Sequence, residues 1–347
     1  MVNADPFANG PKPTGRITAQ MVAIQAGVSL SAVSRTFTKG ASVSADTRSK
    51  VETVAAAMGY RPNRLARSLM TGRTQLVGLA ANTFSNPTFM PVFDLFTRRL
   101  QARGLRPLLA NLAGERDAES ALDMMLQYQV DAVLIASDNP PEGFALSCQA
   151  AGLPVINLFG RTQAVDSVPV VTVDNLAGGR LAAEAMLERG IRRAAFMGGP
   201  ASSVASQDRG EGFCRCFEAG GGLMVARMFA GDYAYERGRE TAQALLDRDT
   251  GAEGLFCGDD IIALGALDIC RDRKVRVPEE LSIIGFDNMD MAAWSPYRLT
   301  TIRQPIAEMV DAAISQIAAH LDDAGQVLHS QVYPCELIER ASLRSRS

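Results

Sequence analysis

Short apolar runs alternate with helical segments along most of this chain, and this alternation most limits the folds open to it. From Gln75 onward, apolar runs typical of buried strands lie near residues 76–80, 106–110, 132–136, 155–158, 170–173, 194–198, 254–257 and 282–286. Segments with helical periodicity lie between them, among them 89–103, 118–129, 175–189, 206–219 and 260–273. Repeated strand–helix–strand units build parallel sheets with helices on both faces. The pattern therefore predicts an α/β core with two such sheets in tandem and a cleft between two lobes.

A second pattern, at residues 19–38, predicts a helix-turn-helix. Ala23 is a small residue where two helices must approach closely, and Gly27 follows where the turn needs a positive φ. Val33 lies where the second helix, expected at about 30–37, returns an apolar side chain to the core. On these residues alone, an ordinary helical hairpin is the other interpretation.

The next segment predicts a third helix and then a short basic one. Ser44 is a suitable N-cap for the third helix, Asp46 lies in its first turn, and Pro62 is expected to end it. Residues 65–70 then form a short, leucine-bearing basic helix. A helix of this length is not stable alone in water, so it should order only against a partner.

Charge is distributed unevenly along the chain. Residues 16–72 hold eight Lys and Arg against two acids, a charge of +6, although the whole chain has a net charge of −3. A basic head on an acidic body is typical of a module that binds a polyanion. Residues 1–15 have no apolar signal region and are expected to be a disordered leader, so the six cysteines should remain reduced thiols in the cytoplasm. No apolar run is long enough to span a membrane.

Several motifs in sequence order identify a family. AGVSLSAVSR, VSADTR, GYRPNRLARSLMTGRT and QLVGLAANTFSNP closely resemble the LacI/GalR family of bacterial transcription regulators, as do the later VTVDNLAGGRLAAEAMLERG, FCGDDIIALGAL, IIGFDN, LTTIRQP and LIERAS. The resemblance implies an N-terminal helix-turn-helix head, a hinge helix and a two-lobed, periplasmic-binding-protein-like core with two parallel, doubly wound sheets. The implied boundaries are a leader at 1–15, a DNA-binding domain at 16–62, a hinge helix and linker at 63–74, an N-terminal lobe at 75–173 plus 302–336, and a C-terminal lobe at 174–301.

The implied function is sequence-specific DNA binding controlled by a small ligand between the lobes. The resemblance implies a homodimer, a repressor, whose two heads enter successive major grooves of a pseudo-palindromic operator in double-stranded DNA. The base-reading positions would be Leu30, Ser31 and Arg35. Candidates for phosphate contacts are Thr18, Ser29, Ser34 and Asn63. Ala66 and Leu69 lie on the hinge helix, where the leucine would enter the minor groove and kink the duplex.

The resemblance also implies an effector site beyond the carboxyl ends of the strands. Phe89 would supply an apolar wall, Arg209 would bind hydroxyls or carboxylates, and Tyr233 would stack on a ligand ring. Asp287 would accept a hydrogen bond from the ligand, and Asp259 lies where the family usually has Asn. Because an acid at 259 disfavours an anionic group and Arg209 favours one, a neutral sugar and a sugar acid both remain open.

An enzyme is not expected from this sequence. The two histidines, His320 and His329, lie away from the cleft loops, and the chain has no nucleophile motif or phosphate-binding loop. Asp259, Asp260 and Asp287, with Asp290, resemble a metal or general-acid site, but a sugar-binding cleft explains them equally well. The sequence predicts no catalytic residues, no metal and no cofactor. A sugar-binding receptor of a transporter, which shares the core fold, is the alternative function, and the basic head argues against it.

Overall fold

The chain divides into two compact units, Met1–Gly72 and Arg73–Ser347. The computed structural model describes residues 17–38, 40–62, 72–82, 86–87, 89–113, 115–161 and 168–346. The expected leader at 1–15 and hinge helix at 65–70 lie outside these ranges, as do Asn63, Ala66 and Leu69.

The described part of the first unit is three helices around a small core. These helices are α1 (Ala19–Ala26), α2 (Leu30–Thr36) and α3 (Ala45–Met58). Val22, Ala23, Val33 and Val51 are buried between them. Gly27 adopts a φ of 62°, so the turn between α1 and α2 has the predicted left-handed residue.

The ends of these helices follow from capping residues. Ser44 accepts a hydrogen bond from the Thr47 backbone N–H at 3.2 Å, which confirms the predicted N-cap of α3. The expectation that Pro62 ends this helix is wrong. Gly59, with a φ of 68°, ends it after Met58, because Tyr60 N–H then reaches the carbonyl of Ala55 at 2.8 Å.

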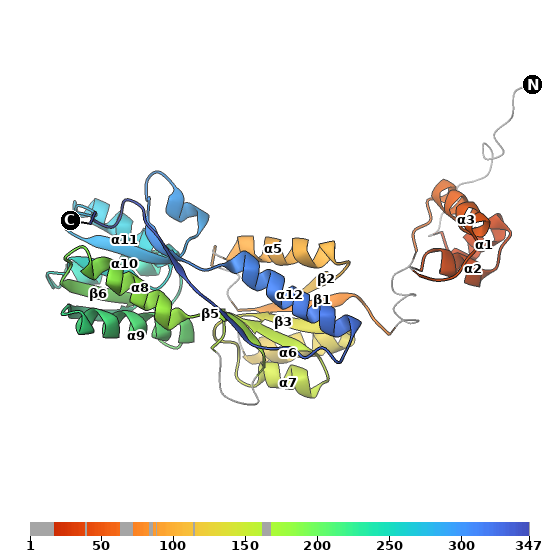
Figure 1. Cartoon of the computed structure of the whole chain (residues 1–347), viewed down its shortest axis with the longest axis horizontal. Coiled ribbons are helices and arrows are strands. Elements are labelled where there is room, and N and C mark those ends of the chain that lie inside the picture. Colours follow the sequence, from red (N-terminus) through yellow and green to blue (C-terminus); the bar gives the residue numbers. More distant parts are fainter. Residues whose placement is uncertain are drawn as a thin grey trace, which may run out of the picture. The chain divides into compact units, whose positions relative to one another are not determined.

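The described part of the second unit holds two sheets of six strands (Figure 1). The sheet of the first lobe has the order β11-β5-β4-β3-β1-β2. Its strands are β1 (Leu76–Ala81), β2 (Arg106–Asn111), β3 (Ala132–Ala136), β4 (Val155–Leu158), β5 (Val170–Val173) and β11 (Gln331–Tyr333). The sheet of the second lobe has the order β12-β10-β9-β8-β6-β7. Its strands are β6 (Arg193–Gly198), β7 (Leu223–Phe229), β8 (Gly254–Cys257), β9 (Ser282–Asp287), β10 (Thr300–Arg303) and β12 (Glu336–Ile338).

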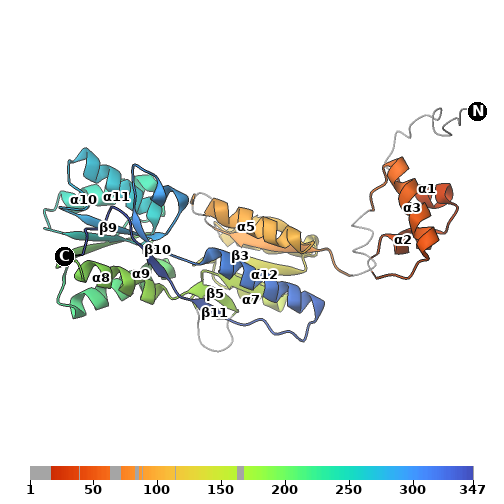
Figure 2. The same ribbon diagram turned by 45° about the horizontal axis from the view of Figure 1, so that its top comes forward.

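Helices cover both faces of each sheet, as Figures 1 and 2 show. In the first lobe, α5 (Phe89–Ala102) and α12 (Ile306–Asp322) pack on one face, and α6 (Glu115–Gln127) and α7 (Phe144–Ala150) pack on the other. In the second lobe, α8 (Asn175–Leu187) and α9 (Val204–Ala219) lie opposite α10 (Tyr235–Leu246) and α11 (Asp260–Asp272). A short 3-10 helix, η1 (Asp290–Ala293), follows β9. All pairings among the described strands are parallel except that of β10 with β12, so the described strands have the predicted α/β fold.

The lobe boundaries differ from those expected at the C-terminal end. The expected boundary at 301/302 divides β10, whose four residues all belong to the second lobe. The chain returns to the first lobe for α12 and β11, and then β12 pairs with β10 in the second lobe. This last crossing was missed because β11 and β12 are three residues each and have no buried apolar run. Ser342 secures the tail beyond β12, since its hydroxyl accepts from Thr300 N–H at 2.8 Å.

Candidate functional site

The helix α2 and its N-cap present exposed polar and apolar side chains. Leu30 is 48% exposed, and Ser29, Ser31 and Arg35 are exposed as well. Ser29 is the N-cap of α2, where its hydroxyl accepts from Ala32 N–H at 3.2 Å and lies 2.9 Å from the Ser31 hydroxyl. These side chains are therefore accessible to a partner from solvent.

Two other head residues have structural partners. Thr18 caps α1 and accepts from Met21 N–H at 3.3 Å. Arg48, one of the basic residues, donates from Nη1 to the Thr36 carbonyl at 2.7 Å and so ties α3 to the end of α2. Ser34 is half-buried. Part of the head's positive charge therefore also stabilises its fold.

A small cavity of about 50 Å³ lies between the two lobes of the second unit. The five residues predicted for an effector site all line it: Phe89 from the first lobe, and Arg209, Tyr233, Asp259 and Asp287 from the second. The residues that line the cavity therefore come from loops and helices that follow strands of both sheets.

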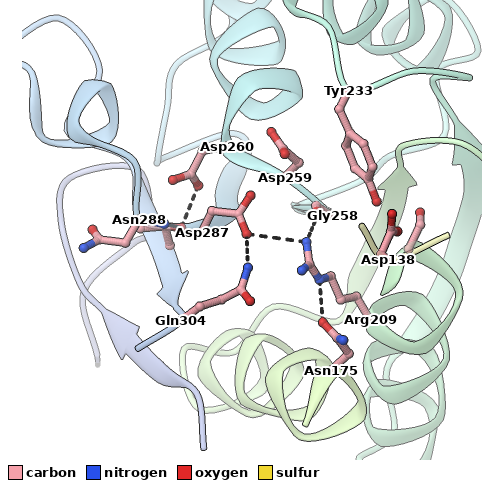
Figure 3. A network of polar contacts seen from close by, with 12 residues as sticks. Asp138, Asn175, Arg209, Tyr233, Gly258, Asp259, Asp260, Asp287, Asn288 and Gln304 are labelled. Atoms are coloured by element: carbon pink, nitrogen blue, oxygen red, sulfur yellow. Dashed lines mark hydrogen bonds and ion pairs between the residues drawn. The ribbon is translucent and has the colours of Figure 1, made fainter. Parts of the chain in front are cut away.

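Arg209 of α9 lines this cavity and has several polar contacts (Figure 3). Its Nε donates to Oδ1 of Asn175 at 2.8 Å, and its Nη1 donates to the carbonyl of Gly258 at 2.7 Å. Nη1 also lies 3.6 Å from Oδ1 of Asp287, and the guanidinium lies 3.6 Å from the centre of the Phe286 ring. Because only 6% of Arg209 is exposed, these contacts form a buried ion pair and not a surface one.

Asp259 and Asp287 lie next to each other in the cavity wall. Asp259 caps α11, where its Oδ1 accepts from Ile261 N–H at 2.6 Å, and its Oδ2 accepts from the Asn86 amide at 3.3 Å. The bond from Asn86 crosses between the lobes. Burial raises the pKa of Asp259 well above its ordinary value, and the nearby Asp287 carboxylate raises it further. Burial also raises the pKa of Asp287, although the Arg209 guanidinium opposes this.

The other two acids of the predicted cluster point elsewhere. Asp260 is fully buried and accepts from the Thr301 hydroxyl at 2.6 Å and from Met289 N–H at 2.9 Å. Asp290 is exposed. Among the described residues, no group of three or more His, Cys, Asp or Glu could hold a metal ion. Asp260 fixes the loop after β9 in place.

Aromatic side chains close two sides of the cavity. Phe89 packs edge-on against Phe159, with 5.7 Å between the ring centres. The Tyr233 hydroxyl lies 2.8 Å from the Ser203 hydroxyl, which itself donates to Asp138 of the first lobe. Burial raises the pKa of Tyr233, so this phenol is neutral.

Sequence reasoning missed several lining residues, among them Asn86, Asp138 and Gln304. Asp138 comes two residues after β3, a position where parallel sheets gather polar groups, so its place after a strand could have signalled it. Gln304 directly follows β10, so the same signal applied to it. Asn86 has no such signal, because its partner Asp259 is fixed only by the packed lobes.

We expect Asp259→Asn to stabilise the protein, by a margin that grows with pH. The carboxyl ionises near its ordinary pKa of about 3.9 in the unfolded chain, whereas its pKa is raised in the fold. At a pH above the pKa of the unfolded chain, the folded state binds more protons at Asp259 than the unfolded state does. The wild-type carboxyl therefore makes the free energy of unfolding fall as the pH rises. The gain in melting temperature should therefore increase from about pH 5 to about pH 8.

Calorimetry over this pH range measures the effect, and one kcal/mol corresponds to about 2–4 °C for a lobe of this size. Asp117→Asn, an exposed carboxyl on α6, is the control. A gain that stays constant with pH, or a loss at every pH, would contradict the expectation.

Comparisons with known proteins cover almost the whole chain. Residues 18–63 match the model described as bacterial regulatory proteins, lacI family, and residues 183–343 match a periplasmic binding protein-like domain. The transcriptional regulator CelR of Thermobifida fusca is 31% identical over 298 residues, which cover 84% of this chain and 87% of CelR. The transcriptional repressor CytR of Escherichia coli (strain K12) is 28% identical over 330 residues, covering 94% and 96% of the two chains.

Solved structures of transcriptional regulators are also similar to this chain. A CelR–cellobiose complex is 28% identical with a TM-score of 0.71, over 94% of this chain and all of that one. A lac repressor dimer bound to operator and the anti-inducer ONPF is 24% identical with a TM-score of 0.84, over 95% of this chain and all of that one. This second likeness shows the shared fold.

The head, the two-lobed core and these matches define a sequence-specific DNA-binding transcriptional regulator, and not an enzyme. The chain belongs to the lacI family of bacterial regulatory proteins. The match to the repressor CytR spans 94% of this chain, the head and the core together, which favours a regulator over a transporter receptor. No described helix is long and apolar enough to cross a membrane.

Proposed function

We propose that this chain is a repressor whose affinity for its operator is controlled by a carbohydrate, a sugar or a sugar acid, bound in the cavity between the lobes. The observation that supports this most is the construction of the cavity wall from both lobes, with Asn86 of the first bonded to Asp259 of the second. A ligand that touches both lobes can have different affinities for two lobe arrangements, and only such a difference shifts an equilibrium. The complex of the related CelR with cellobiose supports the ligand class.

The proposed effector residues are Phe89, Arg209, Tyr233, Asp259 and Asp287. Arg209 and Asp287 would bind ligand hydroxyls, and Phe89 and Tyr233 would flank the ring. The proposed lobes are those of the structure, with β10 and β12 in the second.

On DNA, we propose that two chains act as a homodimer in the cytoplasm on a pseudo-palindromic operator. The exposure of Leu30, Ser31 and Arg35 supports their role in reading bases. The proposed phosphate contacts come from Thr18, Ser29, Ser34 and Asn63, with Ala66 and Leu69 on a hinge helix in the minor groove. The Ser29 hydroxyl already accepts a hydrogen bond as the N-cap of α2, so in a phosphate contact it would act as the donor.

Selection from a random DNA library with the full-length protein tests this function. We expect a pseudo-palindrome to be enriched, and its affinity should fall by orders of magnitude between low and high salt as phosphate counterions are released. Sedimentation of the complex should give two chains per operator. Enrichment of no sequence, or an affinity independent of salt, would contradict the proposal.

A further inference from the structure

The backbone at the end of β9 adopts a conformation that residues with side chains rarely take. Asp287, the last residue of β9, has a φ of 110°, and Asn288 has a φ of 54° (Figure 3). The left-handed region open to such residues lies at a φ of about 50–70°, so Asp287 is outside it. A strained conformation of this kind persists only where the surrounding structure holds it. Because Asp287 lines the cavity, whatever holds this turn also places its carboxyl group.

Two side chains of the second lobe hold the backbone of the turn. Met289 N–H donates to Oδ2 of Asp260 at 2.9 Å. Asn288 N–H donates to the Thr301 hydroxyl at 3.3 Å, and this hydroxyl donates to Oδ1 of Asp260 at 2.6 Å. These bonds fix backbone groups, whereas the side chain of Asn288 has a different partner.

That partner, Arg340, comes from the C-terminal tail. Arg340 lies two residues beyond β12 and donates from Nη2 to Oδ1 of Asn288 at 2.7 Å. Its Nη1 donates to the Leu299 carbonyl, also at 2.7 Å, so one guanidinium binds both ends of the segment 288–299. A planar guanidinium with five donors in fixed positions suits such a two-point contact, which a lysine ammonium does not reproduce.

The tail has other contacts that secure it without the Arg340 side chain. The Ser342 hydroxyl donates to the Ile283 carbonyl at 2.6 Å, and the Ser342 carbonyl accepts from Ile283 N–H at 2.7 Å. Ser342 is 2% exposed, and Leu343 beside it is buried in the core of the second lobe. Loss of the Arg340 side chain should therefore release the turn while the tail stays packed.

We propose that Arg340 is a positioning residue of the effector site, which holds the turn at 287–289 and thereby places the Asp287 carboxyl group in the cavity wall. Arg340 is not among the described residues that line the cavity, so its effect on a ligand passes through Asn288 and Asp287. The proposal rests on the proposed function only in taking Asp287 as an effector contact. It makes the C-terminal tail part of the apparatus that recognises the effector.

Hydrogen exchange of the full-length protein without ligand tests the hold on the turn. In Arg340→Ala, the amides of Asn288 and Met289 should exchange at least about tenfold faster, because their hydrogen bonds open more often. The milder Arg340→Lys keeps the charge but loses the two-point contact, so it should also speed exchange there. Unchanged exchange at both amides in both variants would overturn the proposal.

Arg346→Ala is the matched control. This exposed arginine of the same tail pairs with Glu188 and Glu339, so its loss removes the same charge without touching the turn. Exchange at the turn should then match the wild-type protein. An equal acceleration in Arg346→Ala would show that the charge of the tail, and not the contact of Arg340, holds the turn.

A double-mutant cycle tests whether the effect passes through Asn288. Glycine accepts a φ of 54° without strain, and Asn288→Gly also removes the acceptor of Arg340. In this background, Arg340→Ala should change exchange at Met289 by less than about threefold. A tenfold effect of Arg340→Ala in both backgrounds would contradict the proposed route.

Calorimetric titration with cellobiose, glucose and glucuronate separates this inference from the proposed function. For a probe that binds the wild-type protein, Arg340→Ala should weaken binding about tenfold and leave operator affinity without ligand unchanged. Unchanged probe affinity, despite faster exchange at the turn, would overturn the role of Arg340 in effector recognition. If the wild-type protein binds none of the three, the proposed ligand class fails, while the exchange measurements still decide whether Arg340 places Asp287.

Discussion

Arg209→Ala will abolish the response of operator binding to the effector. Arg209 lines the cavity and connects α9 to Asn175, to the Gly258 carbonyl and to Asp287. If Arg209 contacts the ligand as proposed, the variant loses a charge-assisted contact, and each such contact contributes roughly 1.5–3 kcal/mol. That loss reduces the ligand's differential affinity for the two lobe arrangements about tenfold or more. The measurement is operator affinity with and without the sugar or sugar acid that binds the wild-type protein best.

The same substitution should also lower stability. It leaves Asp287 buried without its cation, and breaking a buried pair in this way costs about 3–5 kcal/mol. Operator binding without effector therefore serves as the check that the variant is folded. Arg215→Ala, an exposed arginine on the same helix, is the matched control. A wild-type response in Arg209→Ala would show that the effector binds elsewhere.

Local patterns in the sequence were sufficient for much of the fold. The turn at Gly27 and the N-cap at Ser44 depend on neighbouring residues, and the structure has both. Eight of the described strands, β1 to β6 with β8 and β9, follow from short apolar runs between helical segments. The strand β7 was not predicted, because none of its residues is fully buried. The order of the strands in both sheets also brings the loops after β1, β6, β8 and β9 to one cavity.

Features that depend on distant partners could not be read from the sequence. The strand β12 forms because it pairs with β10. The paired residues Arg303 and Glu336 are 33 positions apart in the sequence. The sequence shows Arg48 only as one of the basic residues of the head. Its hydrogen bond to the Thr36 carbonyl could not be predicted, because it forms only when the helices of the head pack together. Among the residues that the structure describes, Oε1 of Gln304 has no hydrogen-bond partner, and its burial depends on the packing of the whole fold.

Arg35→Ala will remove most of the preference for the operator over scrambled DNA. Arg35 lies exposed in the last turn of α2, on the helix that presents Leu30 and Ser31. A bidentate contact of arginine with a guanine contributes roughly 1–3 kcal/mol of discrimination. Each half-site of a dimer would lose this amount, so the ratio of operator to scrambled affinity should fall by more than about tenfold. Titration of both DNAs at one salt concentration measures the ratio.

Lys50→Ala separates base reading from simple attraction to phosphates. Lys50 is exposed on α3 of the same unit, and its loss removes the same charge as the loss of Arg35. A charge that acts through phosphates affects operator and scrambled DNA alike and changes the salt dependence of both. We therefore expect Lys50→Ala to leave the ratio of affinities unchanged, whereas Arg35→Ala should spare scrambled DNA relative to the operator. Equal losses on both DNAs for Arg35→Ala would show that Arg35 contacts only the phosphate backbone.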